Sequence, residues 1–177
     1  GGDASIKQML RDVLSCGKPA VIDADGLNNL DNELKKLLSL RHVLTPHPGE
    51  MARLTGKSIE DVLRDPAGFA ENTAKAFGCI VLLKGAVSVA AHPDGRLRYN
   101  ASGNPGLAKG GSGDVLTGII TALLAQGLEP FDAASAGAYI LGSSAESALE
   151  LLHERALTAG DVLDAIEKTA GITEHRN

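Results

Sequence analysis

The sequence of 177 residues predicts an α/β fold with a mainly parallel central sheet and helices on both faces of that sheet. First, short runs of apolar residues alternate along the chain with longer segments in which apolar residues recur at helical spacing. Second, the short runs are apolar throughout, which is typical of parallel strands covered on both faces. Third, polar clusters directly follow these runs, and such sheets bind ligands at the carboxyl ends of their strands.

The first half of the chain alternates helices and strands. A helix is predicted over residues 5–14, where the apolar side chains share one face. An apolar strand over Pro19–Asp23 follows it, and Ala24–Gly26 turns the chain. The pattern then predicts a helix over 30–40, a strand over 41–45 that ends at Pro46, and short helices over 50–55 and 58–63.

The second half begins with a helix over 66–77 that ends at Gly78 and leads into the clearest strand, residues 79–83. Strands over 87–91 and 96–100 flank the turn sequence His92–Gly95 and predict a β-hairpin. Helices are then predicted over 114–126, 130–153 and 158–168, and a polar tail over 173–177.

Composition and charge exclude several classes of protein. The net charge of −5 and the absence of a long basic run argue against a nucleic-acid partner. Aromatic residues make up only 3% of the chain, so a base-stacking platform is not expected. Because no apolar run is long enough to cross a bilayer, we expect no membrane partner. Cys16 and Cys79 lack metal-site spacing and suit a reduced, cytoplasmic protein.

The most informative segment is the glycine-rich loop, residues 103–113, which runs into the apolar helix predicted from Asp114. The first N–H groups of a helix have no partner within it, and the helix dipole gives them partial positive charge. Glycines allow these N–H groups to surround an anion, so the loop predicts a phosphate site with Asp114 beside it. The alternative is a tight turn in which Asp114 only stabilises the helix, by ~1 kcal/mol.

Three further polar clusters lie at predicted strand ends. His47 is held between two prolines in the segment Thr45–Glu50, which suits either a ligand-facing imidazole or a rigid surface turn. Lys84 either lies along a polyphosphate or is a solvated lysine. The cluster Asp23–Asn28 either caps the next helix or holds a metal ion or a ribose hydroxyl.

Taken together, these motifs resemble one known family. The segments Asp23–Asn28, Thr45–Leu54 and Gly103–Gly118, in this order, are similar to those of the ADP-dependent NAD(P)H-hydrate dehydratases, which belong to the ribokinase-like superfamily. Thr158–Leu163 also fits the C-terminal helix of the family. The resemblance implies a three-layer ribokinase-like sandwich, of which residues 1–172 are the C-terminal portion of a single domain.

The resemblance implies a carbon–oxygen lyase that repairs hydrated NADH and NADPH, with ADP (or ATP) as phosphoryl donor and with Mg²⁺. In this family the 6-hydroxyl group is thought to be phosphorylated, after which phosphate is eliminated. Asp114 is implied as the base that takes the hydroxyl proton and as a substrate contact. His47 is implied as a second substrate contact, and Glu50 as the acidic position that organises magnesium through water.

The other implied site residues bind phosphate and nucleotide. The anion hole for the transferred phosphoryl group consists of Gly110, Gly111, Ser112 and Gly113. The nucleotide-binding residues are Lys84, Gly85, Ala86, Val87, Ser88 and Gly113. We also expect a homo-oligomer.

Two features depart from the family pattern. Family members have a longer N-terminal part with a Gly-Pro-Gly-Leu-Gly loop, and Gly1–Gly2 is consistent with the end of that loop. Residues 141–147 stand where many relatives carry a sequence with more glycine and aspartate. Two other functions stay open: a ribokinase-like kinase for a vitamin precursor or small alcohol, and a nucleotide-binding fragment without turnover.

Overall fold

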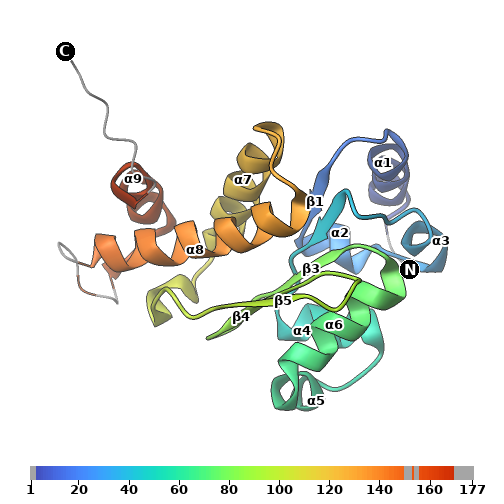
Figure 1. Ribbon diagram of the computed structural model, residues 1–177, viewed down its shortest axis with the longest axis horizontal. Helices are drawn as coiled ribbons and strands as arrows, with labels where there is room; N and C mark the ends of the chain where they lie inside the picture. Colours follow the sequence, from blue (N-terminus) through green and yellow to red (C-terminus); the bar gives the residue numbers. More distant parts are fainter. Residues whose placement is uncertain (1–2, 150–152, 154–155, 170–177) are drawn as a thin grey trace.

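The computed structural model describes residues 3–149, 153 and 156–169. Five strands in this part of the chain form one sheet with the order β1-β2-β3-β4-β5 (Figure 1). The strands are β1 (Ala20–Ile22), β2 (His42–Leu44), β3 (Ile80–Leu83), β4 (Ser88–Ala91) and β5 (Leu97–Asn100). The first three are parallel to one another, whereas β4 is antiparallel to both β3 and β5. Because β5 therefore runs in the same direction as β1–β3, the sheet is mainly parallel, as predicted.

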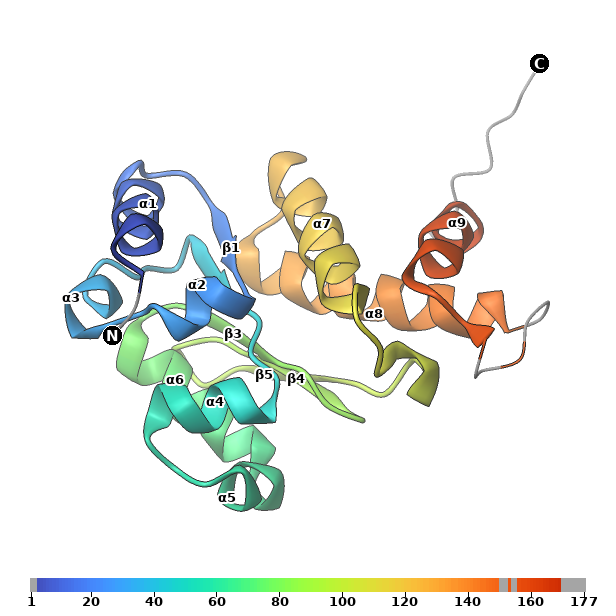
Figure 2. The ribbon, with the colours of Figure 1, turned by 180° about the vertical axis from the view of Figure 1, so that it is seen from behind.

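Helices cover both faces of the sheet, as the views in Figures 1 and 2 show. One layer consists of α1 (Ala4–Ser15), α2 (Ala24–Asn28), α3 (Asn32–Lys35), α4 (Pro48–Thr55), α5 (Ile59–Arg64) and α6 (Pro66–Phe77). The other consists of α7 (Ser112–Ala125), α8 (Pro130–Ala148) and α9 (Ala159–Thr169), with the short 3₁₀ helix η1 (Pro105–Leu107) before it. The predicted three-layer sandwich is confirmed.

The side chains of β3 show how the sheet separates two cores. Val81 and Leu83 belong to the hydrophobic cluster on the side of α1–α6, and Ile80 and Leu82 belong to the cluster on the side of α7–α9. All four are at most 2% exposed. Successive residues of a strand point to opposite faces, so a strand buried on both faces must be apolar at every position. This explains why the strand has no alternation in its sequence.

Most predicted element ends agree with the structure, because capping residues define them. Ser58 accepts a hydrogen bond from the Asp61 N–H at the start of α5, and Gly78 ends α6. Cys79, beside Gly78, is fully buried at the start of the clearest strand, and this burial raises the pKa of its thiol to about 12. Such a thiol behaves as a small apolar residue, as predicted.

The prediction of a helix over residues 30–40 is wrong for most of that range. The structure has only the four-residue α3. Asp31 accepts hydrogen bonds from the Glu33 and Leu34 N–H groups and starts the helix there. After Lys35 the chain tightens: the Leu37 and Leu38 N–H groups donate to the carbonyls three residues earlier. Leucines at helical spacing predicted the buried face correctly, but not where the helix ends.

Two smaller differences concern the chain after β1 and the end of α8. The residues predicted as a turn at 24–26 begin the short helix α2. The helix predicted over 130–153 ends at Ala148, and most of the remainder of that prediction lies outside the described residues. The predicted polar tail also lies outside them. In the part of the chain that is described, no helix has the length and apolar character needed to cross a membrane.

Candidate active site

The N-terminus of α7 lies at the end of the glycine-rich loop, as predicted. Gly111 occupies the N-cap position with φ +94°, a left-handed conformation that suits glycine, and no side chain caps the helix there. By contrast, Asp3, His47 and Ser58 cap α1, α4 and α5 with their side chains. Three leucine and isoleucine side chains of α7 are buried in the core and fix the helix: Leu116, Ile120 and Leu124. The first N–H groups of α7 are therefore held rigidly without a capping side chain, as an anion site requires.

A charged pair from two strand ends lies directly beside this helix terminus. Lys84 follows β3 and Asp23 follows β1, and the Lys84 Nζ donates to the Asp23 carboxylate at 2.8 Å. A Cβ atom placed on Gly113 would lie 3.2 Å from Asp23 Oδ2 and 3.7 Å from Lys84 Nζ. The two side chains are only 22% and 14% exposed. The carboxyl ends of two parallel strands and the start of α7 thus meet at one point.

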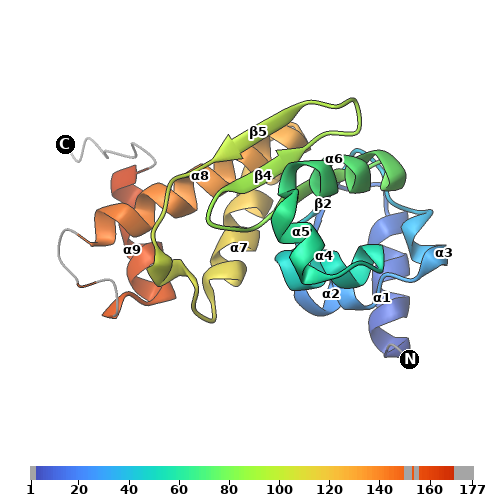
Figure 3. The ribbon, with the colours of Figure 1, turned by 90° about the horizontal axis from the view of Figure 1, so that it is seen from below.

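A cavity of about 760 Å³ opens next to this point. It brings together seven of the residues predicted for the site: His47, Lys84, Gly85, Ala86, Ser88, Ser112 and Gly113. Its other walls come from residues 102–109 of the loop region and from α8, which lies alongside that region in the view from below (Figure 3). The backbone bond from the Lys84 N–H to the Pro46 carbonyl, 2.8 Å long, holds the His47 segment against the end of β3.

The other predicted residues flank this cavity rather than line it. Gly110 and Gly111 immediately precede the lining residues of α7, and Val87 lies between lining residues of the hairpin. Asp114 is in the first turn of α7 and is exposed to solvent. A carboxylate there lies beside the uncapped N–H groups of α7 and is accessible from solvent.

His47 and Glu50 form a capping box at the start of α4. The His47 Nδ1 accepts from the Gly49 N–H at 3.0 Å, and Glu50 Oε2 accepts from the His47 N–H at 2.8 Å. Because Nδ1 is an acceptor here, the neutral ring carries its proton on Nε2, 3.5 Å from Glu50 Oε1. The imidazole is 51% exposed, whereas the Glu50 side chain is 7% exposed. The ring is thus positioned rigidly while it remains accessible from the cavity.

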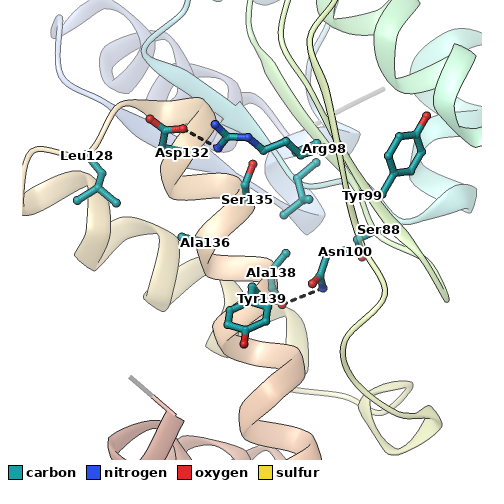
Figure 4. A pocket seen from close by; sticks show the side chains of 12 residues that line it. Ser88, Arg98, Tyr99, Asn100, Leu128, Asp132, Ser135, Ala136, Ala138 and Tyr139 are labelled. Carbon is teal, nitrogen blue, oxygen red and sulfur yellow. Dashed lines mark hydrogen bonds and ion pairs between the residues drawn. The ribbon is translucent and has the colours of Figure 1, made fainter. Parts of the chain in front are cut away.

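A second cavity of about 410 Å³ lies between the β4–β5 hairpin and α8 (Figure 4). Across it, Arg98 of β5 pairs with Asp132 of α8 at 2.6 Å. The two cavities share Ser88, Asn100 and Ala138, and the Asn100 side chain donates to the Ala138 carbonyl at 3.1 Å. Figure 4 shows this bond from the hairpin to α8. Nothing in the sequence predicted this second cavity.

Sequence reasoning also missed the role of Asp23. The sequence pattern predicts a helix cap, or a metal or ribose site, for Asp23, Asp25 and Asn28, but Asp23 pairs with a lysine 61 residues further along the chain. Asp25 and Asn28 are exposed residues of α2. The available signal was that both Asp23 and Lys84 directly follow predicted parallel strands, whose carboxyl ends share one edge of the sheet.

Comparisons with known proteins identify the family to which the chain is related. Residues 1–168 match the family described as NAD(P)H-hydrate dehydratase. The chain is 48% identical over 148 residues to the bifunctional NAD(P)H-hydrate repair enzyme Nnr of Moorella thermoacetica, covering 82% of this chain and 28% of that protein. It is 43% identical over 153 residues to the ADP-dependent (S)-NAD(P)H-hydrate dehydratase of Neisseria meningitidis, covering 84% of this chain and 52% of that protein.

A solved structure is similar over nearly the whole chain. The ADP/ATP-dependent NAD(P)H-hydrate dehydratase of Bacillus subtilis, co-crystallised with ATP and Mg²⁺, superposes with a TM-score of 0.84 at 30% identity, covering 96% of this chain and 60% of that one. The chain spans about half of the Neisseria protein and less than a third of the Moorella protein. From its match over residues 1–168 and from these relatives, the chain belongs to the NAD(P)H-hydrate dehydratase family and has the ribokinase-like fold.

Proposed function

We propose that the protein containing this chain removes water from (6S)-hydrated NADH and NADPH, with ADP as phosphoryl donor. The observation that carries the proposal is the uncapped start of α7, which faces the cavity beside Lys84. Anion-binding N–H groups, a cation and a nearby carboxylate are the parts that phosphoryl transfer to a hydroxyl group requires. Membership of the dehydratase family supports a hydrated nicotinamide ring as the acceptor.

The chemistry gives a reason for using a nucleotide in a dehydration. Hydroxide is a poor leaving group, so the hydrated ring loses water slowly. In the first step the 6-hydroxyl oxygen bonds to the terminal phosphorus of ADP, the bond from that phosphorus to the bridging oxygen breaks, and AMP leaves. In the second step the bond between carbon and oxygen breaks, and phosphate leaves with the electron pair. The neighbouring ring carbon then loses a proton to water, and the double bond of NADH is restored.

We assign each part of the site a role in these steps. Asp114 accepts the hydroxyl proton during the first step, from its exposed position on the first turn of α7. The backbone N–H groups of residues 110–113 bind the transferred phosphoryl group, on whose oxygens the charge is spread. Residues 84–88 bind the nucleotide, and the half-exposed His47 ring contacts the hydrated nicotinamide nucleotide.

Magnesium would neutralise charge on the phosphates during transfer. Glu50, the residue predicted to organise it, does not fit a direct ligand, since its carboxylate is nearly buried and caps α4. Among the residues that the structure describes, no cluster of three or more His, Cys, Asp or Glu side chains is arranged to hold a metal. Proteins usually bind Mg²⁺ through one or two carboxylates together with substrate phosphates and water. Contact of Glu50 with magnesium through water stays a prediction, and the roles above do not depend on it.

The proposal is tested by identifying the products formed by the full-length protein. With hydrated NADH, ADP and Mg²⁺ we expect NADH absorbance to return, with one AMP and one inorganic phosphate released for each NADH. A stable phosphorylated substrate would instead indicate a ribokinase-like kinase. Binding of ADP without any product would indicate a nucleotide-binding module. Either of these two results contradicts the proposal.

We also propose a cytoplasmic location, which suits a nicotinamide-nucleotide substrate, and a homo-oligomeric state. Light scattering coupled to size-exclusion chromatography measures the second property directly. A monomeric mass would contradict the homo-oligomer without affecting the assigned chemistry.

A further inference from the structure

The start of the loop region, residues 100–104, forms part of the cavity wall but makes its side-chain bonds mainly to α8. The Asn100 amide donates to the Ala138 carbonyl at 3.1 Å, and the Asn104 amide donates to the Ala145 carbonyl at 3.0 Å. The Ser102 hydroxyl lies 3.4 Å from the Tyr139 carbonyl. These three bonds connect the loop to carbonyl groups spread over two turns of α8.

A fourth hydrogen bond to α8 is accepted by a side-chain carboxylate. The Gly103 N–H donates to the Glu146 carboxylate at 2.7 Å. A hydrogen bond to an ionised acceptor is shorter and stronger than one between neutral groups, and this is the charged member of the set. Glu146 lies in α8, and the assigned reaction gives it no role.

The backbone around Gly103 leaves little room for another arrangement. Gly103 has φ +108°, which side chains rarely allow. A Cβ atom on Gly142 of α8 would lie 2.6 Å from the Ser102 carbonyl carbon and oxygen, so helix and loop touch backbone to backbone. Gly103 and Gly142 both line the cavity. The Glu146 carboxylate is thus connected to the cavity wall by its hydrogen bond to the Gly103 peptide group.

We propose that Glu146 is a positioning residue for nucleotide binding: it fixes the Gly103 peptide against α8 and so gives the cavity wall its shape before the nucleotide arrives. A loop that is ordered in advance does not have to be ordered on binding, and this favours affinity. Glu146 is not placed at the reacting atoms. The inference rests on the nucleotide-binding part of the proposed function, and not on which molecule accepts the phosphoryl group.

The test compares Glu146→Ala and Glu146→Gln with the control Glu129→Ala in the full-length protein. Glu129 is an exposed glutamate at the other end of α8 whose side chain makes no capping bond. Calorimetry gives the Kd for ADP, and amide hydrogen exchange followed by NMR gives the exchange rate of the Gly103 N–H. Chemical denaturation gives the stability of each variant.

We expect Glu146→Ala to raise the Kd for ADP by about three- to tenfold, and the Gly103 amide to exchange faster. Glu146→Gln should be intermediate, because its amide oxygen can still accept the bond without the charge. It also provides the test if the alanine variant folds poorly. Glu129→Ala should leave the Kd within about twofold of the wild type.

A Kd for Glu146→Ala within about twofold of that for Glu129→Ala overturns the inference, even if stability falls, because Glu146 would then be merely structural. Failure of the proposed reaction would give a different experimental result. A wild-type protein that binds ADP but yields no NADH contradicts the reaction and leaves this comparison intact. A wild-type protein that does not bind ADP overturns both.

Discussion

At the scale of single residues, the surroundings of Lys84 bear most directly on the proposed binding of phosphate. In the free protein its ammonium group pairs with Asp23 at 2.8 Å, and both side chains are mostly buried. A phosphate entering at Gly113 meets the positive lysine and the positive helix terminus, but also the negative carboxylate of Asp23. Asp23 therefore holds Lys84 in place while it opposes the binding of an anion.

We predict that Asp23→Asn strengthens the binding of ADP by about three- to tenfold, because one negative charge near the phosphates is removed. The asparagine oxygen can still accept from Lys84, so the lysine keeps its position. Calorimetry with ADP in low-salt buffer measures the effect, which should shrink at high salt. Asp25→Asn, an exposed change in the neighbouring helix α2, is the control. Weaker binding by Asp23→Asn would show that the carboxylate does more than position the lysine.

At the scale of elements, β2 buries a histidine at a cost in folding free energy that its sequence does not reveal. Its first residue, His42, is 1% exposed. Its Nδ1 accepts from the Ser39 N–H at 3.0 Å, and among the described residues no hydrogen-bond partner faces its Nε2. Burial, together with the charge of Arg41, lowers the pKa of His42 below its ordinary value of 6.5. The strand therefore accommodates the neutral imidazole better than the charged one.

The stability of the protein should consequently fall as the pH decreases from 7 towards 5. The unfolded chain takes up a proton on His42 near pH 6.5, whereas the folded chain resists it, so each step downward in pH favours unfolding. One such group contributes at most about 1.4 kcal/mol per pH unit to the free energy of unfolding. In urea titrations, His42→Asn should be less stable at pH 8 but should show a shallower fall in acid. Equal slopes for both proteins would contradict this account of His42.

The elements that the sequence predicts well are those in which every signal is local. The strand around β3 is apolar at all positions and is followed by Lys84, and the start of α7 follows a run of glycines. The prediction of a helix over 30–40 failed because leucines at helical spacing can be buried without a continuous α-helix: Leu34 and Leu38 both lie in the core, but α3 ends at Lys35. Asp23 and Lys84 lie 61 residues apart in the sequence, and their contact depends on the order of the strands in the sheet. A local sequence pattern does not specify that order. The bonds from the loop start to α8 were unpredictable for the same reason.

At the scale of the whole molecule, the two helical layers contribute different residues to the site. The sheet and the layer α1–α6 supply Lys84, Asp23 and His47, and the opposite layer supplies the start of α7 and the wall formed by α8. Each layer has its own hydrophobic core, and the cavity opens at the carboxyl ends of the parallel strands, where the two layers meet. A phosphoryl group bound there would contact both layers at once. The rigidity of the sandwich therefore sets the geometry of the proposed transfer.

We propose that Asp114, at the start of α7, takes the proton of the hydroxyl group during phosphoryl transfer. The most direct measurement is the rate of NADH recovery from hydrated NADH and ADP by Asp114→Asn in the full-length protein, with the exposed α9 change Asp164→Asn as control. We predict a rate reduced by about 10²–10⁴ for Asp114→Asn, with ADP binding retained and the control unchanged. A rate for Asp114→Asn within about twofold of the wild type would contradict it.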